Sequence, residues 1–285
     1  MSRIEVGGAG YEVAIGGRID AALDGSAPSL LLIHGFTGSG ADWAQIEPGL
    51  ASEARTITVD LLGHGRSDSP ADPAGPDPAR YSIERQAADL AEILARLGAV
   101  PAVVAGYSMG ARVALRMAVD SPAAVSALIL ESPSAGIAGT ADREARRASD
   151  EDLARLVERD GIAAFVDRWE GLPLFASERA MPAEWRARLH AERMSCRPEG
   201  LAASLRGAGQ GSMEPLHDRL SAVSVATLVI AGGLDAAGAT RARAVAAAIP
   251  GAEIHVIEGV GHAPHREAPE RVLPLMLHAI ERNPS

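Results

Sequence analysis

The stretch Val103-Val-Ala-Gly-Tyr-Ser-Met-Gly-Ala-Arg112 joins a short apolar run, a G-x-S-x-G motif and the start of a second apolar segment. The spacing predicts a buried strand over 103–105 and a helix over 113–118. A strand, G-x-S-x-G and a helix in this order are typical of a nucleophile elbow, where a strained serine needs glycine neighbours. The bare motif could occur by chance among 30 glycines, but its context favours the elbow. Ser108 is therefore a candidate nucleophile.

Short apolar runs and helical patterns alternate on both sides of this elbow. Alternation of this kind predicts a parallel, doubly wound α/β sheet. The segments that carry it are an edge hairpin over 3–6 and 11–15, strands over 30–33, 56–59, 127–130, 227–231 and 254–257, and helices over 83–97, 239–249 and 267–280.

Residues 141–211 interrupt the alternation, because charged helical segments occur there without a convincing strand. Ser149-x-x-Asp152 has the form of a capping box, and Gly161 favours a helix end. We therefore expect a core built from residues 1–135 and 213–285, with a helical lid inserted over 136–212.

Composition narrows the function classes. The 285 residues carry a net charge of −10, which argues against nucleic acid and anionic membrane surfaces. Cys196 is the only cysteine, so no internal disulfide is possible. All 27 basic residues are arginine, which excludes Schiff-base, pyridoxal-phosphate and P-loop lysines. No apolar signal region opens the chain and no apolar run reaches ~18 residues, so we expect a cytoplasmic protein without membrane insertion.

A serine nucleophile needs a base, and the base needs an orienting carboxylate. Asp235 and His262 follow Ser108 in the order typical of this elbow, each just after the carboxyl end of an expected strand. Asp235 could instead cap a helix. His262-x-x-His265 has the spacing of two metal ligands, but no acidic or cysteine partner accompanies it, so we expect no metal.

Oxyanion donors should complete such a site. The backbone N–H groups of Met109, after the nucleophile, and of Phe36, in a glycine-rich loop, are the candidates. An ordinary glycine turn is the alternative for that loop. We expect His34 and His64 to shape nearby loops through hydrogen bonds, and His265 to lie at the surface or to support the site.

The whole chain resembles proteins with the α/β-hydrolase fold. Four motifs carry the resemblance: H-G-F-T-G-S-G-A-D-W from His34, G-H-G-R-S-D from Gly63, G-Y-S-M-G-A-R from Gly106 and G-H-A-P-H-R-E from Gly261. The resemblance implies a mostly parallel eight-stranded sheet with helices on both faces and an inserted helical lid.

The lid carries a narrower resemblance, to the 2-succinyl-6-hydroxy-2,4-cyclohexadiene-1-carboxylate (SHCHC) synthases of menaquinone biosynthesis. Its segments are A-D-R-E-A-R-R-A-S-D from Ala141, A-F-V-D-R-W-E-G-L-P-L-F-A-S from Ala164 and G-L-A-A-S-L-R-G from Gly200. The resemblance implies a cofactor-free lyase that eliminates pyruvate from 2-succinyl-5-enolpyruvyl-6-hydroxy-3-cyclohexene-1-carboxylate. In that family the triad serine is thought to act as a base.

The same resemblance implies a pocket for a small polycarboxylate. Arg112, Arg146 and Arg193 fall on positions that bind the substrate's carboxylates, and Trp169 and Tyr107 fall on positions that line the pocket. Taken from the residues alone, each arginine could equally be a solvated charge or a lid ion pair.

Two departures from the family pattern stand out. Ala237 and Gly238 occupy the places of a lysine and a phenylalanine after the acid, and Ala111 replaces a glycine after the elbow. Two other functions therefore stay open. One is an esterase, thioesterase or carbon–carbon bond hydrolase that uses the same residues. The other is a non-catalytic ligand-binding receptor of the same fold.

Overall fold

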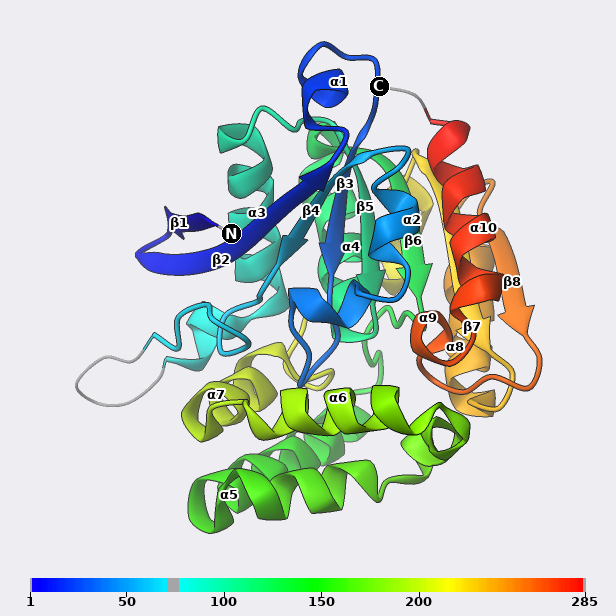
Figure 1. The fold of residues 1–285 in the computed structure, drawn as a ribbon. Helices are drawn as coiled ribbons and strands as arrows, with labels where there is room; N and C mark the ends of the chain where they lie inside the picture. The colour runs from blue at the N-terminus through cyan, green and yellow to red at the C-terminus, as the bar shows by residue number, and fades with distance from the viewer. Residues whose placement is uncertain (1, 71–76, 284–285) are drawn as a thin grey trace.

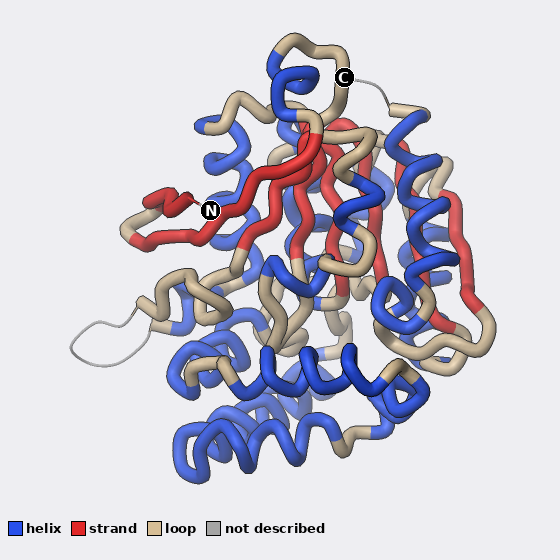
Figure 2. The backbone as a smooth tube through the Cα atoms, viewed as in Figure 1, coloured by secondary structure: helices blue, strands red, loops and turns tan. Residues whose placement is uncertain are grey.

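The computed structural model describes residues 2–70 and 77–283, which form an eight-stranded sheet in the order β1-β2-β4-β3-β5-β6-β7-β8 (Figures 1 and 2). β1 pairs antiparallel with β2 and β2 antiparallel with β4, while the neighbours from β4 to β8 are parallel. This is the mostly parallel sheet expected from the sequence. The strands are β1 (Ser2–Val6), β2 (Ala9–Gly17), β3 (Ser29–Ile33), β4 (Arg55–Val59), β5 (Ala102–Tyr107), β6 (Val125–Glu131), β7 (Ala226–Gly232) and β8 (Glu253–Ile257).

Helices cover both faces of the sheet because alternate strand residues point to opposite sides. Leu31 and Ile33 of β3 pack in one apolar cluster with α3, α4 and α8, and Leu30 and Leu32 pack in another with α2 and α10. The helices outside the lid are α1 (Ile19–Leu23), α2 (Glu47–Leu50), α3 (Ile83–Arg96), α4 (Met109–Asp120), α8 (Ala236–Ala248), α9 (Pro264–Glu267) and α10 (Pro269–Glu281).

The lid helices gather on one side of the molecule in Figure 1. They are α5 (Thr140–Glu170), α6 (Ala183–Met194) and α7 (Pro198–Ala208), with the 3-10 segment η4 (Pro173–Ala180) between α5 and α6. A small apolar cluster that includes Val157, Phe165 and Leu201 packs α5 against α7. All these elements fall within 136–212, and the domain boundaries at those two residues stay a prediction.

The start of α5 corrects the sequence analysis. The prediction that Ser149 caps this helix is wrong, because α5 begins at Thr140 and Ser149 lies within it. The expected break at Gly161 is present, since this residue has φ 80° and ψ 179° inside the helical run. α5 is long but highly charged. Within residues 2–70 and 77–283, no helix combines the length and apolar character needed to cross a membrane.

Candidate active site

Ser108 stands on a sharp turn between β5 and α4. Its φ of 52° and ψ of −103° are a conformation that L-residues rarely adopt. A Cβ at Gly106 would lie 2.2 Å from the Gly110 carbonyl oxygen, and a Cβ at Gly110 would lie 2.2 Å from the Ile33 carbonyl oxygen. Both motif glycines are therefore required by close backbone approach, as the elbow interpretation predicts.

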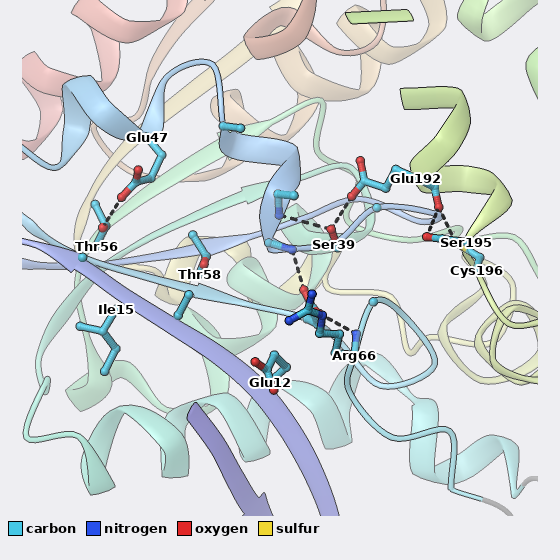
Figure 3. Close-up of a pocket in the computed structure, with 18 residues that line it drawn as sticks. Glu12, Ile15, Ser39, Glu47, Thr56, Thr58, Arg66, Glu192, Ser195 and Cys196 are labelled. Atoms are coloured by element: carbon cyan, nitrogen blue, oxygen red, sulfur yellow. Dashed lines mark hydrogen bonds between the residues drawn. The ribbon is translucent and has the colours of Figure 1, made fainter. Parts of the chain in front are cut away.

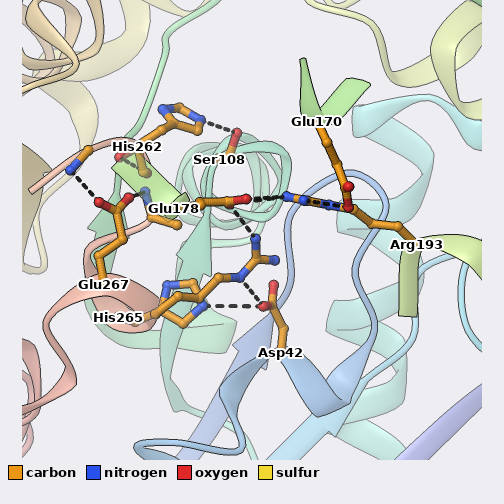
Figure 4. Close-up of polar contacts among 12 residues, drawn as sticks. Asp42, Ser108, Glu170, Glu178, Arg193, His262, His265 and Glu267 are labelled. Carbon is orange, nitrogen blue, oxygen red and sulfur yellow. Dashed lines mark hydrogen bonds and ion pairs between the residues drawn. The ribbon is translucent and has the colours of Figure 1, made fainter. Parts of the chain in front are cut away.

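The structure brings Ser108, His262 and Asp235 into one hydrogen-bonded chain, and Figure 4 shows the contact between Ser108 and His262. His262 Nε2 lies 3.0 Å from Ser108 Oγ, and its Nδ1 lies 2.7 Å from Asp235 Oδ2. Ser132 Oγ donates to the His262 carbonyl oxygen at 2.7 Å and so fixes the loop that carries the imidazole. This geometry is that of a serine, a base and an orienting carboxylate.

Asp235 also fills the alternative role considered for it. Its Oδ1 accepts a hydrogen bond from Gly238 N at 2.8 Å, so the residue caps α8 while its other oxygen meets His262. Burial acts to raise the pKa of Asp235, but hydrogen bonds from His262 and Gly238 outweigh it and leave that pKa below its usual value. A Cβ at Gly238 would lie 2.0 Å from Asp235 Oδ2. The departure from the family's phenylalanine thus makes room for this position of the carboxylate.

The expected oxyanion donors flank Ser108. Met109 is the first residue of α4, where backbone N–H groups have no partner within the helix. Phe36 and Met109 both line the cavity at Ser108. His34 Nε2 accepts from Leu61 N at 2.9 Å, which confirms a loop-shaping role for this histidine. A Cβ at Gly35 would lie 2.6 Å from the Tyr107 ring, so glycine lets the Phe36 loop rest on that ring.

A cavity of about 160 Å³ opens above Ser108, between the sheet and the lid. It is lined by residues of the core and by residues of α5, η4, α6 and α7. All five residues that the family resemblance assigned to the pocket line this cavity: Tyr107, Arg112, Arg146, Trp169 and Arg193. Trp169 packs edge-on against Phe36, with ring centroids 5.2 Å apart, and so joins the lid to the oxyanion loop.

Comparison with known proteins identifies the family of this chain. Residues 30–275 match the family described as the alpha/beta hydrolase family. The chain belongs to this family. It is 36% identical to a Bacillus subtilis protein provisionally named 2-succinyl-6-hydroxy-2,4-cyclohexadiene-1-carboxylate synthase, over 86% of this chain and 87% of that protein.

Two solved structures resemble this alpha/beta hydrolase along nearly its whole length. MenH from S. aureus has a TM-score of 0.87 and 29% identity, covering 96% of this chain and 99% of that one. A thermophilic esterase from Thermogutta terrifontis, with malate bound, has a TM-score of 0.83 and 27% identity over the full length of both chains. Since a named esterase also shares the fold, the fold alone does not choose between the reactions.

Arg112 differs from Arg146 and Arg193 because it is buried without a carboxylate partner among the described residues. It is buried on α4, and its Nη1 donates to the Ala208 carbonyl oxygen at 2.5 Å. Among the residues described, no carboxylate lies within ion-pair distance of its guanidinium. Burial, and then the charge of Arg146, lower the pKa of Arg112 to about 10. A desolvated cation without a carboxylate is suited to an anionic ligand.

The two lid arginines differ from Arg112 because each already has carboxylate partners. Arg146 Nε binds Asp150 Oδ1 at 2.8 Å, and its side chain is 41% exposed. Arg193 is only 3% exposed and binds Glu178 at 2.9 Å and Glu170 at 3.1 Å (Figure 4). The lid ion pairs considered from the sequence are therefore present, while both arginines still line the cavity.

A buried network of charged residues lies next to the loop that carries His262, and His265 is part of it. His265 Nδ1 lies 2.7 Å from Glu131 Oε1, and its ring stacks on Trp43. Its Nε2 lies 3.4 Å from Asp42 Oδ1 (Figure 4). The surface position considered for His265 is wrong, because two carboxylates and the Trp43 ring enclose it. Burial acts to lower the pKa of His265, but Glu131 and Asp42 outweigh it and raise that pKa to about 9.

The His265 network predicts a pH dependence of stability. A folded-state pKa above the unfolded value of about 6.5 makes the stabilisation complete below that pH and lost as pH rises through about 9. We expect Tm to fall between about pH 7 and pH 10, and the fall to be much smaller in His265→Gln. Scanning calorimetry checks this, with exposed His255→Gln as the control. An unchanged fall in His265→Gln would contradict the assignment.

Several cavity residues were missed by the sequence analysis. Asp150, Phe175, Arg241 and Arg266 also line the cavity. Asp150 follows Arg146 by four residues on α5, a spacing that indicates an ordinary helix ion pair. Its place in the cavity follows from the packing of α5 against the core, which no local pattern encodes.

A larger cavity of about 730 Å³ lies apart from Ser108, between the β2 and β4 side of the sheet and α6 (Figure 3). Its lining includes the carboxylates of Glu12, Glu47, Asp60 and Glu192, and among the described residues that line it Arg66 alone is basic. Burial raises the pKa of Glu192 to about 7. A polycarboxylate would be repelled there, so the smaller cavity is the candidate substrate site.

A metal centre was not expected from the sequence. In the part of the chain that the structure describes, no three histidine, cysteine, aspartate or glutamate side chains gather in a way that could hold a metal ion. His262 instead faces Ser108 and Asp235, and His265 faces Glu131 and Asp42.

Proposed function

We propose that this alpha/beta hydrolase is a cofactor-free lyase of menaquinone biosynthesis, which eliminates pyruvate from 2-succinyl-5-enolpyruvyl-6-hydroxy-3-cyclohexene-1-carboxylate. The product is 2-succinyl-6-hydroxy-2,4-cyclohexadiene-1-carboxylate. The observation that carries the proposal is the convergence of Arg112, Arg146 and Arg193 on the cavity of Ser108. The synthase name of the 36% identical relative supports it.

The chemistry of this substrate suits the site. The hydrogen on ring carbon 2 is acidic because the ketone of the succinyl group is next to it. Its removal gives a dienolate, and the electron pair moves through the ring double bond to expel enolpyruvate from carbon 5. Enolpyruvate then becomes pyruvate. The Phe36 and Met109 N–H groups would stabilise the enolate oxygen.

Ser108 Oγ is the proposed base. As it takes the proton from carbon 2, its own proton passes to His262 Nε2, which lies 3.0 Å away. Asp235 Oδ2, 2.7 Å from His262 Nδ1, stabilises the imidazolium that forms. His262 then gives the proton that it received to the methylene carbon of the departing enolpyruvate, which forms pyruvate, so the three residues end in their starting state without a covalent intermediate.

A serine hydrolase is the second candidate, favoured by the similarity to the Thermogutta terrifontis esterase. It would use the same Ser108, His262 and Asp235 to form an acyl-serine. A neutral ester, however, leaves the desolvated charge of Arg112 without an anionic partner. A non-catalytic receptor is disfavoured because it does not need the aligned hydrogen bonds of Ser108 and His262.

Pyruvate release tests the proposal directly. We expect the protein to release pyruvate from the enolpyruvyl substrate, and deuterium at carbon 2 to slow the reaction when chemistry is rate-limiting. A coupled lactate dehydrogenase assay follows the pyruvate, and mass spectrometry of the protein during turnover searches for an adduct. An acyl group on Ser108 would overturn the lyase and support the hydrolase. Full activity of Ser108→Ala in the ligand's biological response would support the receptor.

The remaining expectations for this protein concern its setting. The proposed partner is a small polycarboxylate, and the reaction involves neither nucleic acid nor membrane insertion. The cytoplasmic location expected from the sequence stays a prediction, which cell fractionation can check.

A further inference from the structure

Asp150 is a carboxylate in a cavity otherwise suited to anions. Its side chain is 4% exposed, and its Oδ1 accepts from Arg146 Nε at 2.8 Å. Its Oδ2 is buried and has no hydrogen-bond partner among the residues described. Since Asp150 lines the cavity at Ser108, this oxygen is an unused acceptor beside the substrate site. Unpartnered buried oxygens are rare enough in proteins to need an explanation.

The residues around Asp150 leave space at Oδ2 and favour the ionised form of the carboxylate, so that Oδ2 can accept a hydrogen bond. A Cβ at Gly209 would lie 2.5 Å from Oδ2, so the absence of a side chain there leaves room around this oxygen. Burial raises the pKa of Asp150, while the charges of Arg146 and Arg112 act in the opposite direction and favour its ionised form. Arg146 therefore pairs with one oxygen of this carboxylate and leaves the second without a hydrogen-bond partner among the described residues.

The other unused polar groups of the cavity are donors. Trp169 Nε1 and Arg193 Nε are both buried without a hydrogen-bond partner among the described residues. Donors of this kind match the carboxylates, the ketone and the ether oxygen of the proposed substrate, which can only accept. The substrate has a single donor at neutral pH, the hydroxyl on ring carbon 6. An acceptor such as Asp150 Oδ2 therefore has one possible partner on that molecule.

We propose that Asp150 Oδ2 accepts a hydrogen bond from the ring hydroxyl of the substrate and so selects hydroxylated over deoxygenated rings. This inference rests on the proposed function, and it assigns a recognition role that the three arginines cannot supply. A carboxylate beside a polyanionic ligand repels it unless a donor lies between them. Asp150 thus contributes specificity, because an anion without the hydroxyl meets this repulsion uncompensated.

The test compares kcat/KM for the proposed substrate and for its 6-deoxy analogue in the wild type and in Asp150→Ala. We expect the wild type to prefer the hydroxylated substrate by roughly ten- to a hundredfold, the effect of a hydrogen bond to a charged group. In Asp150→Ala the ratio should approach that of intrinsic reactivity, because the hydroxyl loses its acceptor. Asp150→Asn should keep part of the preference, since an amide oxygen still accepts.

The Arg146→Ala variant distinguishes two roles of Asp150: recognition of the ring hydroxyl and positioning of Arg146. It should lower kcat/KM for both substrates by a similar factor and leave their ratio unchanged. If Asp150→Ala behaves in the same way, Asp150 only positions Arg146 and the proposal is overturned. An Asp150→Ala variant that folds as the wild type does but keeps the wild-type ratio would also overturn it, even if its kcat/KM for both substrates is unchanged. Absence of pyruvate release from both substrates in the wild type would instead reject the proposed function itself.

Discussion

Replacing Ser108 or His262 by alanine should lower the rate of pyruvate release by roughly a thousandfold or more. Each change interrupts the proposed proton relay, because Ser108 Oγ contacts His262 Nε2 and this imidazole in turn contacts Asp235. The proposed oxyanion donors are backbone groups, which both changes leave in place, so a small residual activity is expected. The double variant should lose little beyond either single variant, since the two residues act as one unit.

The fold should survive the loss of the Ser108 hydroxyl, because among the residues that the structure describes this hydroxyl has one polar contact, with His262 Nε2. Single-turnover kinetics and Tm together check the expectation. Ser204→Ala is a matched control, since Ser204 also lines the cavity but lies outside the relay, with a contact to the Met109 sulfur. Either alanine variant that retained more than about a tenth of the wild-type rate would remove Ser108 and His262 from the chemistry.

Replacing Arg112 by methionine should lower kcat/KM by roughly a hundredfold and leave Tm unchanged or raised. The fall in kcat/KM and the unchanged or raised Tm have one cause. A buried guanidinium without a carboxylate carries a desolvation penalty in the free protein, which an anionic ligand relieves. Arg112→Lys should recover only part of the loss, because an ammonium cannot bind a carboxylate with two parallel hydrogen bonds.

Arg116 provides the matched control for Arg112. It lies one turn later on α4, is equally buried, and pairs with Asp120 and Glu214. Arg116→Met should therefore lower Tm and leave kcat/KM largely unchanged, the reverse of Arg112→Met. Steady-state kinetics and calorimetry on both variants decide the matter. A fall in Tm without a change in kcat/KM for Arg112→Met would make this residue structural.

The parts of the site that the sequence could predict are those with local or topological rules. Gly106 and Gly110 identify the elbow in the sequence, because the backbone of neighbouring residues approaches them so closely that no side chain fits there. Asp235 and His262 could be placed because parallel strands end at a common edge, where their loops meet. The expected fold followed from the same alternation of strands and helices.

The parts that could not be predicted depend on how distant elements pack. Ser149 is a residue type that often caps helices, yet the helix begins nine residues before it. A local capping pattern shows where a helix could begin, but it does not show whether the helix already began upstream. His265 belongs to a motif that also fits an exposed loop, and only Glu131 and Asp42, far away in sequence, make it a buried cation. From its sequence spacing, Asp150 forms only an ordinary helical ion pair with Arg146. Its second oxygen, which has no partner among the described residues, is apparent only once the cavity has folded.

Glu178 has a consequence for the timing of the reaction. This residue of η4 binds Arg193 of the lid at 2.9 Å and lies 3.5 Å from Arg266, which follows His262 by four residues in the core. Any outward movement that parts Glu178 from Arg266 would break one ion pair of a buried network, while Glu178 would keep Arg193 and Arg266 would keep Asp42. If product release requires this movement, the rate at which the Glu178–Arg266 ion pair opens sets an upper limit on turnover.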